Sequence, residues 1–189
     1  EDVPARIYKS ISQFIRSSAS EQIELVWFAI RSVAASEQCV PKYNRPSIVV
    51  TTPKGRPHPL RSTSHVLPEI IRNATRKLLI LGYAMRKESG LIDLIREAAS
   101  RNVFIRLIGD RKQASDFFRE LVNHWDLVSP MPELWMGTRA EEWDWLMHCK
   151  VVMADQREVL LGSANFTRRG LETNAELGIH IEDQAISSE

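Results

Sequence analysis

The chain has too few cysteines for a fold held together by disulfides. Only Cys39 and Cys149 occur among its 189 residues, so neither a disulfide framework nor a four-cysteine zinc site can form. Long apolar runs are also missing, because no stretch approaches the roughly 20 residues that span a bilayer. The sequence does not open with the basic and then apolar pattern of a signal peptide. We therefore expect a cytoplasmic protein with no membrane partner.

An excess of one charge is absent too, since 25 Lys and Arg stand against 24 Asp and Glu. The 8 Gly and 9 Pro are ordinary for a globular chain and exclude collagen-like and disordered proteins. The charges are nevertheless divided: residues 54–112 hold 13 Lys and Arg against 5 Asp and Glu, and residues 113–189 hold 6 against 14. The basic half could collect phosphates, the two halves could drive self-association, or these charges could simply cover solvated helices.

Hydrophobic periodicity predicts an α/β fold in two parts. Helical spacing over 3–38, followed by a break at about 40–46, indicates an N-terminal helical extension (1–45) before a second domain (46–189). In the second domain, apolar strands alternate with helices, which predicts βαβ units in a mixed sheet flanked by helices. Strands are predicted at 48–52, 78–83, 103–109, 134–136, 146–153, 159–163 and 175–181, and helices at about 62–76, 91–99 and 114–123.

Two neighbouring strands of this sheet carry polar side chains that suit phosphate chemistry. Residues two apart on a strand point to the same face, so His148 and Lys150 project together. Ser163 and Asn165 form the same kind of pair on the next strand. A turn centred on 156–157 would place Lys150 opposite Ser163 and His148 opposite Asn165. An imidazole, an ammonium, a hydroxyl and a carboxamide on one surface suit a phosphate oxyanion.

The spacing of these residues resembles that of the phospholipase D superfamily, whose motif is H-x-K-x(4)-D-x(6)-G-S-x-N. The resemblance covers about 47–183. The whole arrangement, including the predicted N-terminal helices, is similar to the phospholipase-D-like component of bacterial DISARM phage-defence systems. It implies the superfamily's mixed sheet flanked by helices, and catalysis that uses no metal ion or other cofactor. The matching positions are His148, Lys150, Asp155, Gly162, Ser163 and Asn165.

The resemblance also implies a mechanism that needs two histidines. One attacks phosphorus to form a phosphohistidine, and the other protonates the leaving oxygen and later activates water. Larger superfamily members carry two motifs in one chain, whereas this sequence carries one, because no other histidine has a lysine two residues later. We therefore expect a homodimer in which the two copies of His148 meet across a two-fold axis and share one active site.

Further roles follow from the same resemblance. Lys150 and Asn165 would bind the non-bridging phosphate oxygens. Ser163 would help through its hydroxyl or by shaping the hairpin. Glu176 would accept a hydrogen bond that fixes the imidazole tautomer.

Other residues of this region receive structural assignments. Asp155, at the predicted turn, and Gly162 are expected to be structural members of the motif. Cys149 alternates away from His148 and is expected to be a buried thiol.

Candidate substrate contacts lie outside the motif. Arg56 and Arg61, with His65, could grip a polyanion, although solvated surface is an equally good interpretation. Trp143 and Trp145 could stack on a base or simply pack under their loop.

Three classes of function remain open from the sequence. We favour a metal-independent nuclease of low sequence specificity, acting on DNA rather than RNA in anti-phage defence. A non-catalytic accessory subunit, which binds nucleic acid or another defence protein, is the alternative. A phospholipase or phosphatidyl transferase would use the same chemistry, but those relatives usually carry two motifs and often a membrane anchor.

Overall fold

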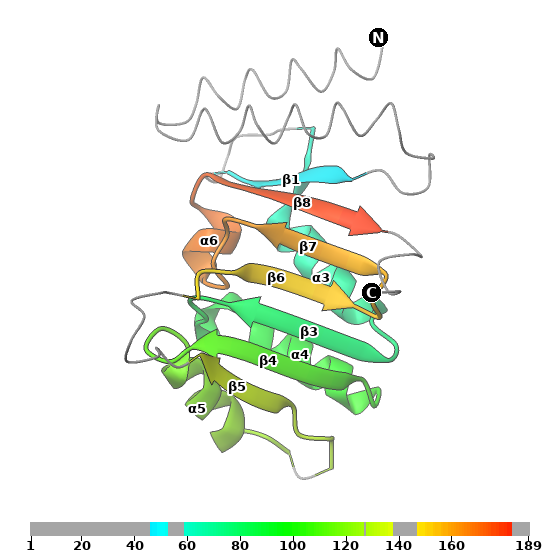
Figure 1. The fold of residues 1–189 in the computed structure, drawn as a ribbon, viewed down its shortest axis with the longest axis vertical. Coiled ribbons are helices and arrows are strands. Elements are labelled where there is room, and N and C mark those ends of the chain that lie inside the picture. Colours follow the sequence, from blue (N-terminus) through cyan, green and yellow to red (C-terminus); the bar gives the residue numbers. More distant parts are fainter. Residues whose placement is uncertain (1–45, 53–58, 127, 138–146, 183–189) are drawn as a thin grey trace.

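A computed structural model of the chain describes residues 46–52, 59–126, 128–137 and 147–182. These residues form one eight-stranded mixed β-sheet with helices packed on one face (Figure 1). The predicted fold class is therefore confirmed for this part of the chain. The helices predicted at 3–38 and the predicted boundary near residue 45 lie outside the described residues.

The strands follow the order β2-β1-β8-β7-β6-β3-β4-β5 across the sheet. β3, β4 and β5 are parallel, whereas β6, β7 and β8 are antiparallel neighbours, and β6 joins the two groups by pairing antiparallel with β3. The bounds are β1 Ser47–Thr51, β2 Arg61–Ser62, β3 Lys77–Gly82, β4 Phe104–Asp110, β5 Glu133–Gly137, β6 Lys150–Ala154, β7 Glu158–Gly162 and β8 Glu176–Glu182.

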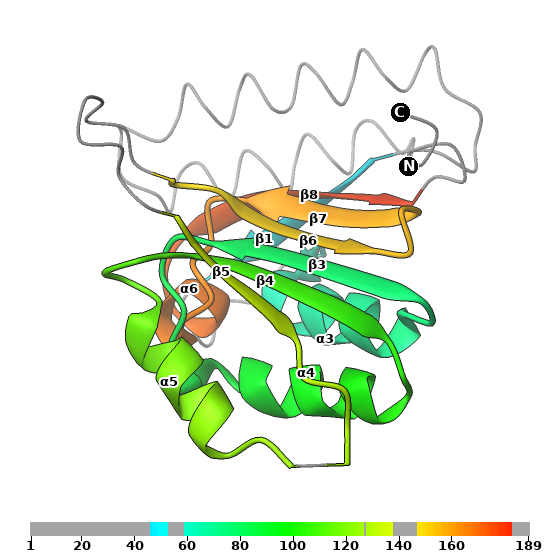
Figure 2. The same cartoon turned by 60° about the horizontal axis from the view of Figure 1, so that its bottom comes forward.

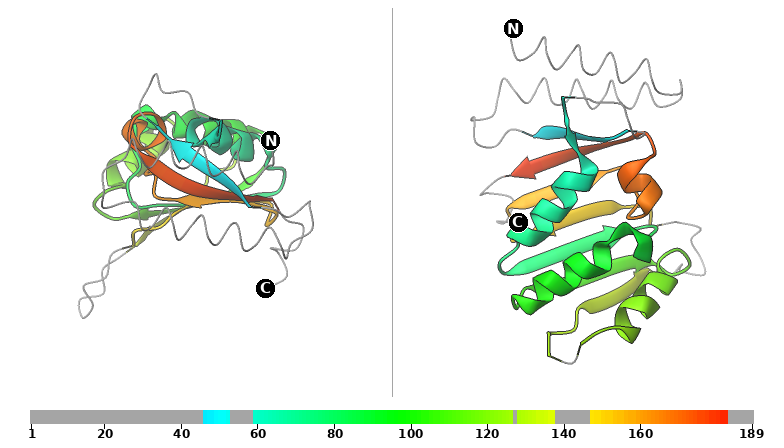
Figure 3. Two further views of the ribbon diagram at one scale, coloured as in Figure 1. Left: turned by 90° about the horizontal axis from the view of Figure 1, so that it is seen from above. Right: turned by 180° about the vertical axis from the view of Figure 1, so that it is seen from behind.

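The described helices cover the same face of the sheet, as the views in Figures 2 and 3 show. Among them, no helix is both long and apolar enough to cross a membrane. Their bounds are α3 Thr63–Asn73, the short 3-10 helix η3 Lys87–Ser89, α4 Leu91–Ser100, α5 Ser115–Asn123 and α6 Arg168–Glu172.

The core lies between these helices and the sheet. On β3, Leu78 and Ile80 are fully buried, while the alternating residues on the other face are only partly buried. Leu91 and Ile95, four residues apart on α4, are fully buried against them. Each such side chain contributes about 1.5–3 kcal/mol through removal of apolar surface from water. The β3-α4-β4 unit is therefore the predicted βαβ unit.

The connectivity gathers the polar motif at one edge of the sheet. β3, β4, β5 and β7 end, and β6 and β8 begin, along the edge on the left in Figure 1. We call it the site edge. His148 lies just before β6, Lys150 opens β6, and Ser163 directly follows β7. Glu176 opens β8 at the same edge.

The β6–β7 hairpin differs from the predicted register by one residue. Val151 pairs with Leu161, so the prediction that Ser163 lies opposite Lys150 was wrong. The reason is the turn, where residues 155–156 adopt φ values of 54° and 59°. Turn conformation sets the register of a hairpin, and two consecutive left-handed residues other than glycine are not evident from the sequence pattern.

Asn165 also lies elsewhere than predicted. β7 ends at Gly162, and the chain then crosses the end of β6 to reach the residues that follow β3. There, the backbone N–H of Phe166 donates to the carbonyl of Ala84 at 3.1 Å. Asn165 therefore does not face His148 on a continuous strand, as the hairpin prediction required; it reaches the site edge through this crossover.

Candidate active site

The structure brings the side chains of His148 and Lys150 into contact. Nζ of Lys150 lies 2.9 Å from each ring nitrogen and 2.9 Å from the carbonyl oxygen of His148. Lys150 is 6% exposed, whereas the imidazole stands at the exposed surface. Desolvation, and secondly the charge of Lys150, lower the pKa of His148 below its usual value. A neutral imidazole keeps a lone pair for attack on phosphorus or for proton transfer.

Tyr83 completes this cluster, although nothing in the motif marks it. Its ring centroid lies 4.6 Å from that of His148 at an interplanar angle of 60°, and Nζ of Lys150 lies 5.5 Å from the same ring. The backbone N–H of Tyr83 donates to the carbonyl of Cys149 at 3.0 Å, which fixes the end of β3 against the start of β6. The ring shields one side of the imidazole from water and gives the ammonium a cation–π partner.

The carboxylate of Glu176 has partners other than the expected one. Oγ of Ser163 donates to one oxygen and Nδ2 of Asn174 donates to the other, the latter at 3.0 Å. Among the described residues, no hydrogen bond joins Glu176 to His148. Burial lowers the pKa of Lys150, and the nearby negative charge of Glu176 opposes that shift. A role for Glu176 in orienting the imidazole stays a prediction.

Ser163 and Gly162 shape the junction of β7 and β8. Oγ of Ser163 accepts a hydrogen bond from the N–H of Leu177 at 3.1 Å while it donates to Glu176. A Cβ at Gly162 would lie 2.7 Å from the carbonyl oxygen of Leu177 and 2.8 Å from Cα of Gly178. Only glycine therefore permits the two strands to approach this closely at the site edge.

The side chain of Asn165 has no hydrogen-bond partner for its buried Oδ1 within the described part of the chain. Its backbone is held firmly, because its carbonyl accepts from the N–H of Thr167 at 2.8 Å. In addition, a Cβ at Gly170 of α6 would collide with that carbonyl. An unpaired buried polar atom costs about 1–3 kcal/mol, so Oδ1 lowers stability, and only the Nδ2 group of this carboxamide can donate to a phosphate oxygen.

Asp155, the remaining charged member of the motif, lies at the opposite edge of the sheet. Its carboxylate accepts hydrogen bonds from the N–H groups of Thr75, Arg76 and Lys77, each at 2.8 Å, and from the hydroxyl of Thr75 at 2.7 Å. Burial opposes ionisation, but these hydrogen bonds prevail and hold the pKa of Asp155 at about 2. They join the β6–β7 turn to the start of β3.

The other sequence predictions fare differently. The thiol of Cys149 is exposed, so the prediction of a buried thiol was wrong. Cys149 has the parity of Val151 and Met153, which lie on the less buried face of β6. Arg61 is paired with Glu69 and lies 3.4 Å from Nδ1 of His180, on the β2 margin of the sheet. Arg56, Trp143 and Trp145 lie outside the described residues.

Much of the positive charge is neutralised locally. Exposed ion pairs of this kind contribute at most about 1 kcal/mol each, and within the described residues they neutralise five Lys and Arg side chains of the basic half. For these residues, the solvated-surface interpretation of the basic half is the better one. The pairs are Arg61–Glu69, Arg72–Glu97, Lys87–Glu120, Arg101–Glu97 and Arg106–Glu133.

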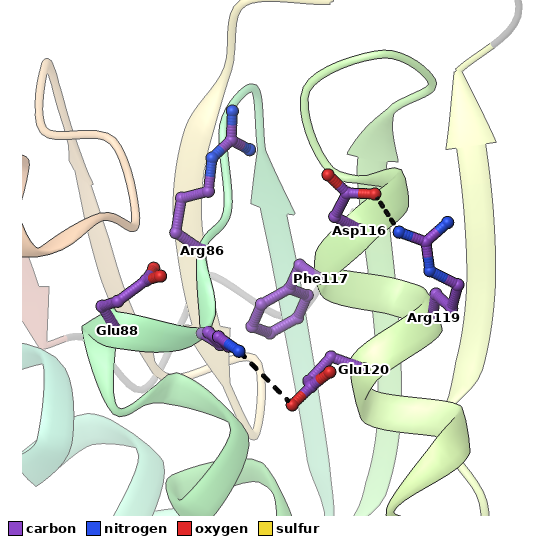
Figure 4. A pocket seen from close by; sticks show the side chains of 7 residues that line it. Arg86, Glu88, Asp116, Phe117, Arg119 and Glu120 are labelled. Atoms are coloured by element: carbon purple, nitrogen blue, oxygen red, sulfur yellow. Dashed lines mark hydrogen bonds and ion pairs between the residues drawn. The ribbon is translucent and has the colours of Figure 1, made fainter.

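A cavity of about 280 Å³ lies between η3 and the first turns of α5 (Figure 4). Its charged walls are balanced by ion pairs between Asp116 and Arg119 and between Lys87 and Glu120. The cavity therefore offers little net attraction to an anion. In the part of the chain that the structure describes, no group of three or more His, Cys, Asp or Glu side chains is placed to hold a metal ion.

Comparison with known families gives the arrangement a context. The family described as "Cardiolipin synthase, PLD-like domain" matches residues 67–189, a stretch that includes the whole His148 to Asn165 motif. The chain belongs to this phospholipase D-like family. The membership predicted from the motif is confirmed.

Individual relatives agree with this assignment. The DISARM protein DrmC of Bacillus paralicheniformis is 27% identical over 140 residues, which are 73% of this chain and 57% of that protein. The chain thus spans little more than half the length of this curated relative. The phospholipase D family member Nuc from Salmonella typhimurium has a similar fold, with a TM-score of 0.54, 20% identity, and coverage of 73% of this chain and 84% of that one. The phosphatidylserine synthase of Haemophilus influenzae is similar at a TM-score of 0.53 and 14% identity, over 96% of this chain and 50% of that one.

Proposed function

We propose that the chain is a metal-independent phosphodiesterase that cleaves nucleic acid with low sequence specificity, DNA in preference to RNA. The observation that carries the proposal is the contact between the imidazole of His148 and the ammonium of Lys150 at the site edge. A neutral imidazole is the form that can attack, and a fixed positive charge beside it is what a phosphate oxyanion requires.

The reaction would proceed in two displacements. In the first, a ring nitrogen of His148 forms a bond to phosphorus, the bond from phosphorus to the leaving oxygen breaks, and a second histidine gives that oxygen a proton. In the second, water attacks the phosphohistidine, its proton passes to the second histidine, and the P–N bond breaks. Lys150 would hold the non-bridging oxygens through its ammonium, and Asn165 would donate to them from its Nδ2 group.

The second histidine would come from another copy of the chain. One motif supplies one His148, so a homodimer with the two site edges facing each other across a two-fold axis completes the pair. The exposed position of His148 is compatible with such a meeting.

The first test is cleavage of labelled single-stranded and duplex DNA in EDTA by the wild-type chain and by His148→Ala. We expect cleavage in EDTA and a loss of about 10⁴-fold or more in the variant. Labelled RNA and phosphatidylcholine vesicles serve as competing substrates. Cleavage of the lipid alone would replace nuclease with phospholipase, and no cleavage by a dimeric preparation would favour the accessory-subunit alternative.

The shared site has its own test. When wild-type and His148→Ala chains are mixed equally and allowed to exchange subunits, random dimers should retain about a quarter of the wild-type activity if both histidines are needed, instead of about half. In a Cys39→Ser background, a short bis-maleimide should also link the exposed Cys149 thiols of two subunits. The matched control carries Cys149→Ser and Arg157→Cys, which moves the thiol to the opposite edge and should abolish the link.

A role in phage defence is proposed from the relative named a DISARM protein. A bacterial strain that depends on this chain for phage resistance should lose that resistance when His148→Ala replaces the wild type, if catalysis is what the system needs. Resistance that survives the substitution, with cleavage abolished in vitro, would assign the chain a binding role.

A further inference from the structure

The loop that follows β4 reaches the site edge close to Lys150. Gly82 of β3 pairs with Lys150 on one side and with Gly109 on the other. Two strand spacings, about 10 Å in total, therefore separate the backbone of Lys150 from that of Gly109. Arg111 and Lys112 come directly after β4 ends, so they flank the candidate active site on the β4 side.

This loop has a fixed conformation. Oδ1 of Asp110, whose side chain is buried, accepts from the N–H of Lys112 at 3.0 Å and from that of Gln113 at 2.9 Å. From the β3 side, the guanidinium of Arg86 donates to the carbonyl of Gln113 and, at 3.3 Å, to its side-chain oxygen. The chain therefore orders these residues without using the side chains of Arg111 and Lys112.

Those two side chains are exposed, and within the described residues neither makes an ion pair or a side-chain hydrogen bond. Their neighbours differ, since Lys87 and Arg119 are paired with acids in the adjacent cavity wall (Figure 4). On the other side of the sheet, Arg61, the predicted substrate contact, is paired with Glu69. Within the described residues, the loop after β4 thus carries two exposed cations without an ion-pair partner on the β4 side of the site.

We infer that Arg111 and Lys112 form a phosphate-binding site that holds the backbone of the nucleic-acid substrate and directs it across the β4 side of the sheet. The inference rests on the proposed nuclease function and adds to it the path of the strand. Contacts of this kind bind any sequence, because they meet phosphates and not base edges. Binding through them depends on salt, since each neutralised phosphate releases counterions.

The test measures binding of single-stranded and duplex DNA across a salt series, in the His148→Ala background so that cleavage does not interfere. The variant is Arg111→Gln with Lys112→Gln. The matched control is Arg76→Gln with Arg157→Gln, which removes the same charge from exposed side chains beside Asp155 at the opposite edge. Thermal unfolding and light scattering check that both variants keep the fold and the oligomeric state.

We expect the loop variant to bind about tenfold or more weakly at 100 mM salt and to reduce the log–log salt slope for duplex DNA by about 2. The control should keep the wild-type slope. Equal losses in both variants, or no loss in either, would overturn the inference. The nuclease function would still stand if the wild type cleaves DNA in EDTA. Loss of the dimer in the loop variant would assign the loop to the subunit contact and also overturn it. Absence of both cleavage and binding in the wild type would overturn the function and the inference together.

Discussion

The polar side chains at the two ends of the β6–β7 hairpin differ in how completely their hydrogen bonds are satisfied. At the turn, the carboxylate of Asp155 accepts four hydrogen bonds. At the site edge, Asn165 leaves a buried oxygen unpaired, and Lys150 is held in a buried position against a neutral imidazole. A saturated group contributes to stability, whereas an unpaired buried oxygen and a buried ammonium lower it.

One short motif thus spans two kinds of structure. Its aspartate joins the turn to the start of β3, about 80 residues earlier in the chain. Its histidine is exposed, and both this histidine and the buried lysine lie against the ring of Tyr83. Residues that belong to one sequence motif therefore need not have similar roles in the structure. Substitutions at the two ends should therefore separate activity from stability.

The largest effect of this kind is expected from Lys150→Met. The thioether roughly keeps the volume but removes the positive charge beside His148, so cleavage should fall about 10²–10³-fold through lost stabilisation of the phosphate oxyanion. Stability should stay the same or increase, because burial disfavours the ammonium and lowers the pKa of Lys150. Cleavage rates in EDTA and urea unfolding of the same preparation check both expectations.

A mutant that lost stability and activity together would contradict the comparison, since Lys150 would then belong with Asp155 as a structural residue. Arg157→Met, at the exposed turn, is a matched control for loss of a cation and should change neither quantity.

The sequence was most informative where local geometry decides the outcome. The contact between His148 and Lys150 follows from the two-residue period of an extended chain, whatever the rest of the fold does. The alternation of apolar segments likewise predicted the β3-α4-β4 unit, because an amphipathic helix and buried strands have distinct periods.

Contacts between segments far apart in the chain could not be predicted from the sequence in the same way. The left-handed turn at 155–156 moved the register by one residue, and the crossover to Ala84 carried Asn165 away from β7. Tyr83 meets His148 only because β3 pairs with β6, which are far apart in the chain. Pairings of this kind depend on the whole sheet, so spacing within one motif cannot supply them.

The next effect concerns stability alone. Asp155→Asn keeps the shape of the side chain but loses the charge, so the free energy of unfolding at pH 7 should fall by about 1–2 kcal/mol. Because folding lowers the pKa of Asp155 from 3.8 to about 2, the wild type's advantage should be complete above pH 4 and disappear as the pH falls toward 2. Urea unfolding at several pH values measures this difference.

Cleavage by folded Asp155→Asn at 25 °C should match the wild type. A large loss of activity with unchanged stability would show that Asp155 takes part in cleavage, and the two ends of the hairpin would then not differ in role.

The smallest effect is expected at Tyr83, whose ring packs against the imidazole of His148 at the site edge. Tyr83→Leu removes the ring that shields the imidazole, so the pKa of His148 should rise toward its usual value and the acidic limb of the cleavage profile should move to higher pH. At a pH below that limb, cleavage should fall about tenfold, because less imidazole is neutral and its orientation is looser. NMR titration of His148 measures the pKa independently of activity.

Tyr83→Phe is the control: it keeps the ring, so the pKa of His148 and the cleavage rate should match those of the wild type. A Phe variant as impaired as the Leu variant would show that the effect depends on the hydroxyl. An unchanged His148 titration in Tyr83→Leu would show that the ring only packs against the site edge, and Tyr83 would then belong to the structural half of the comparison.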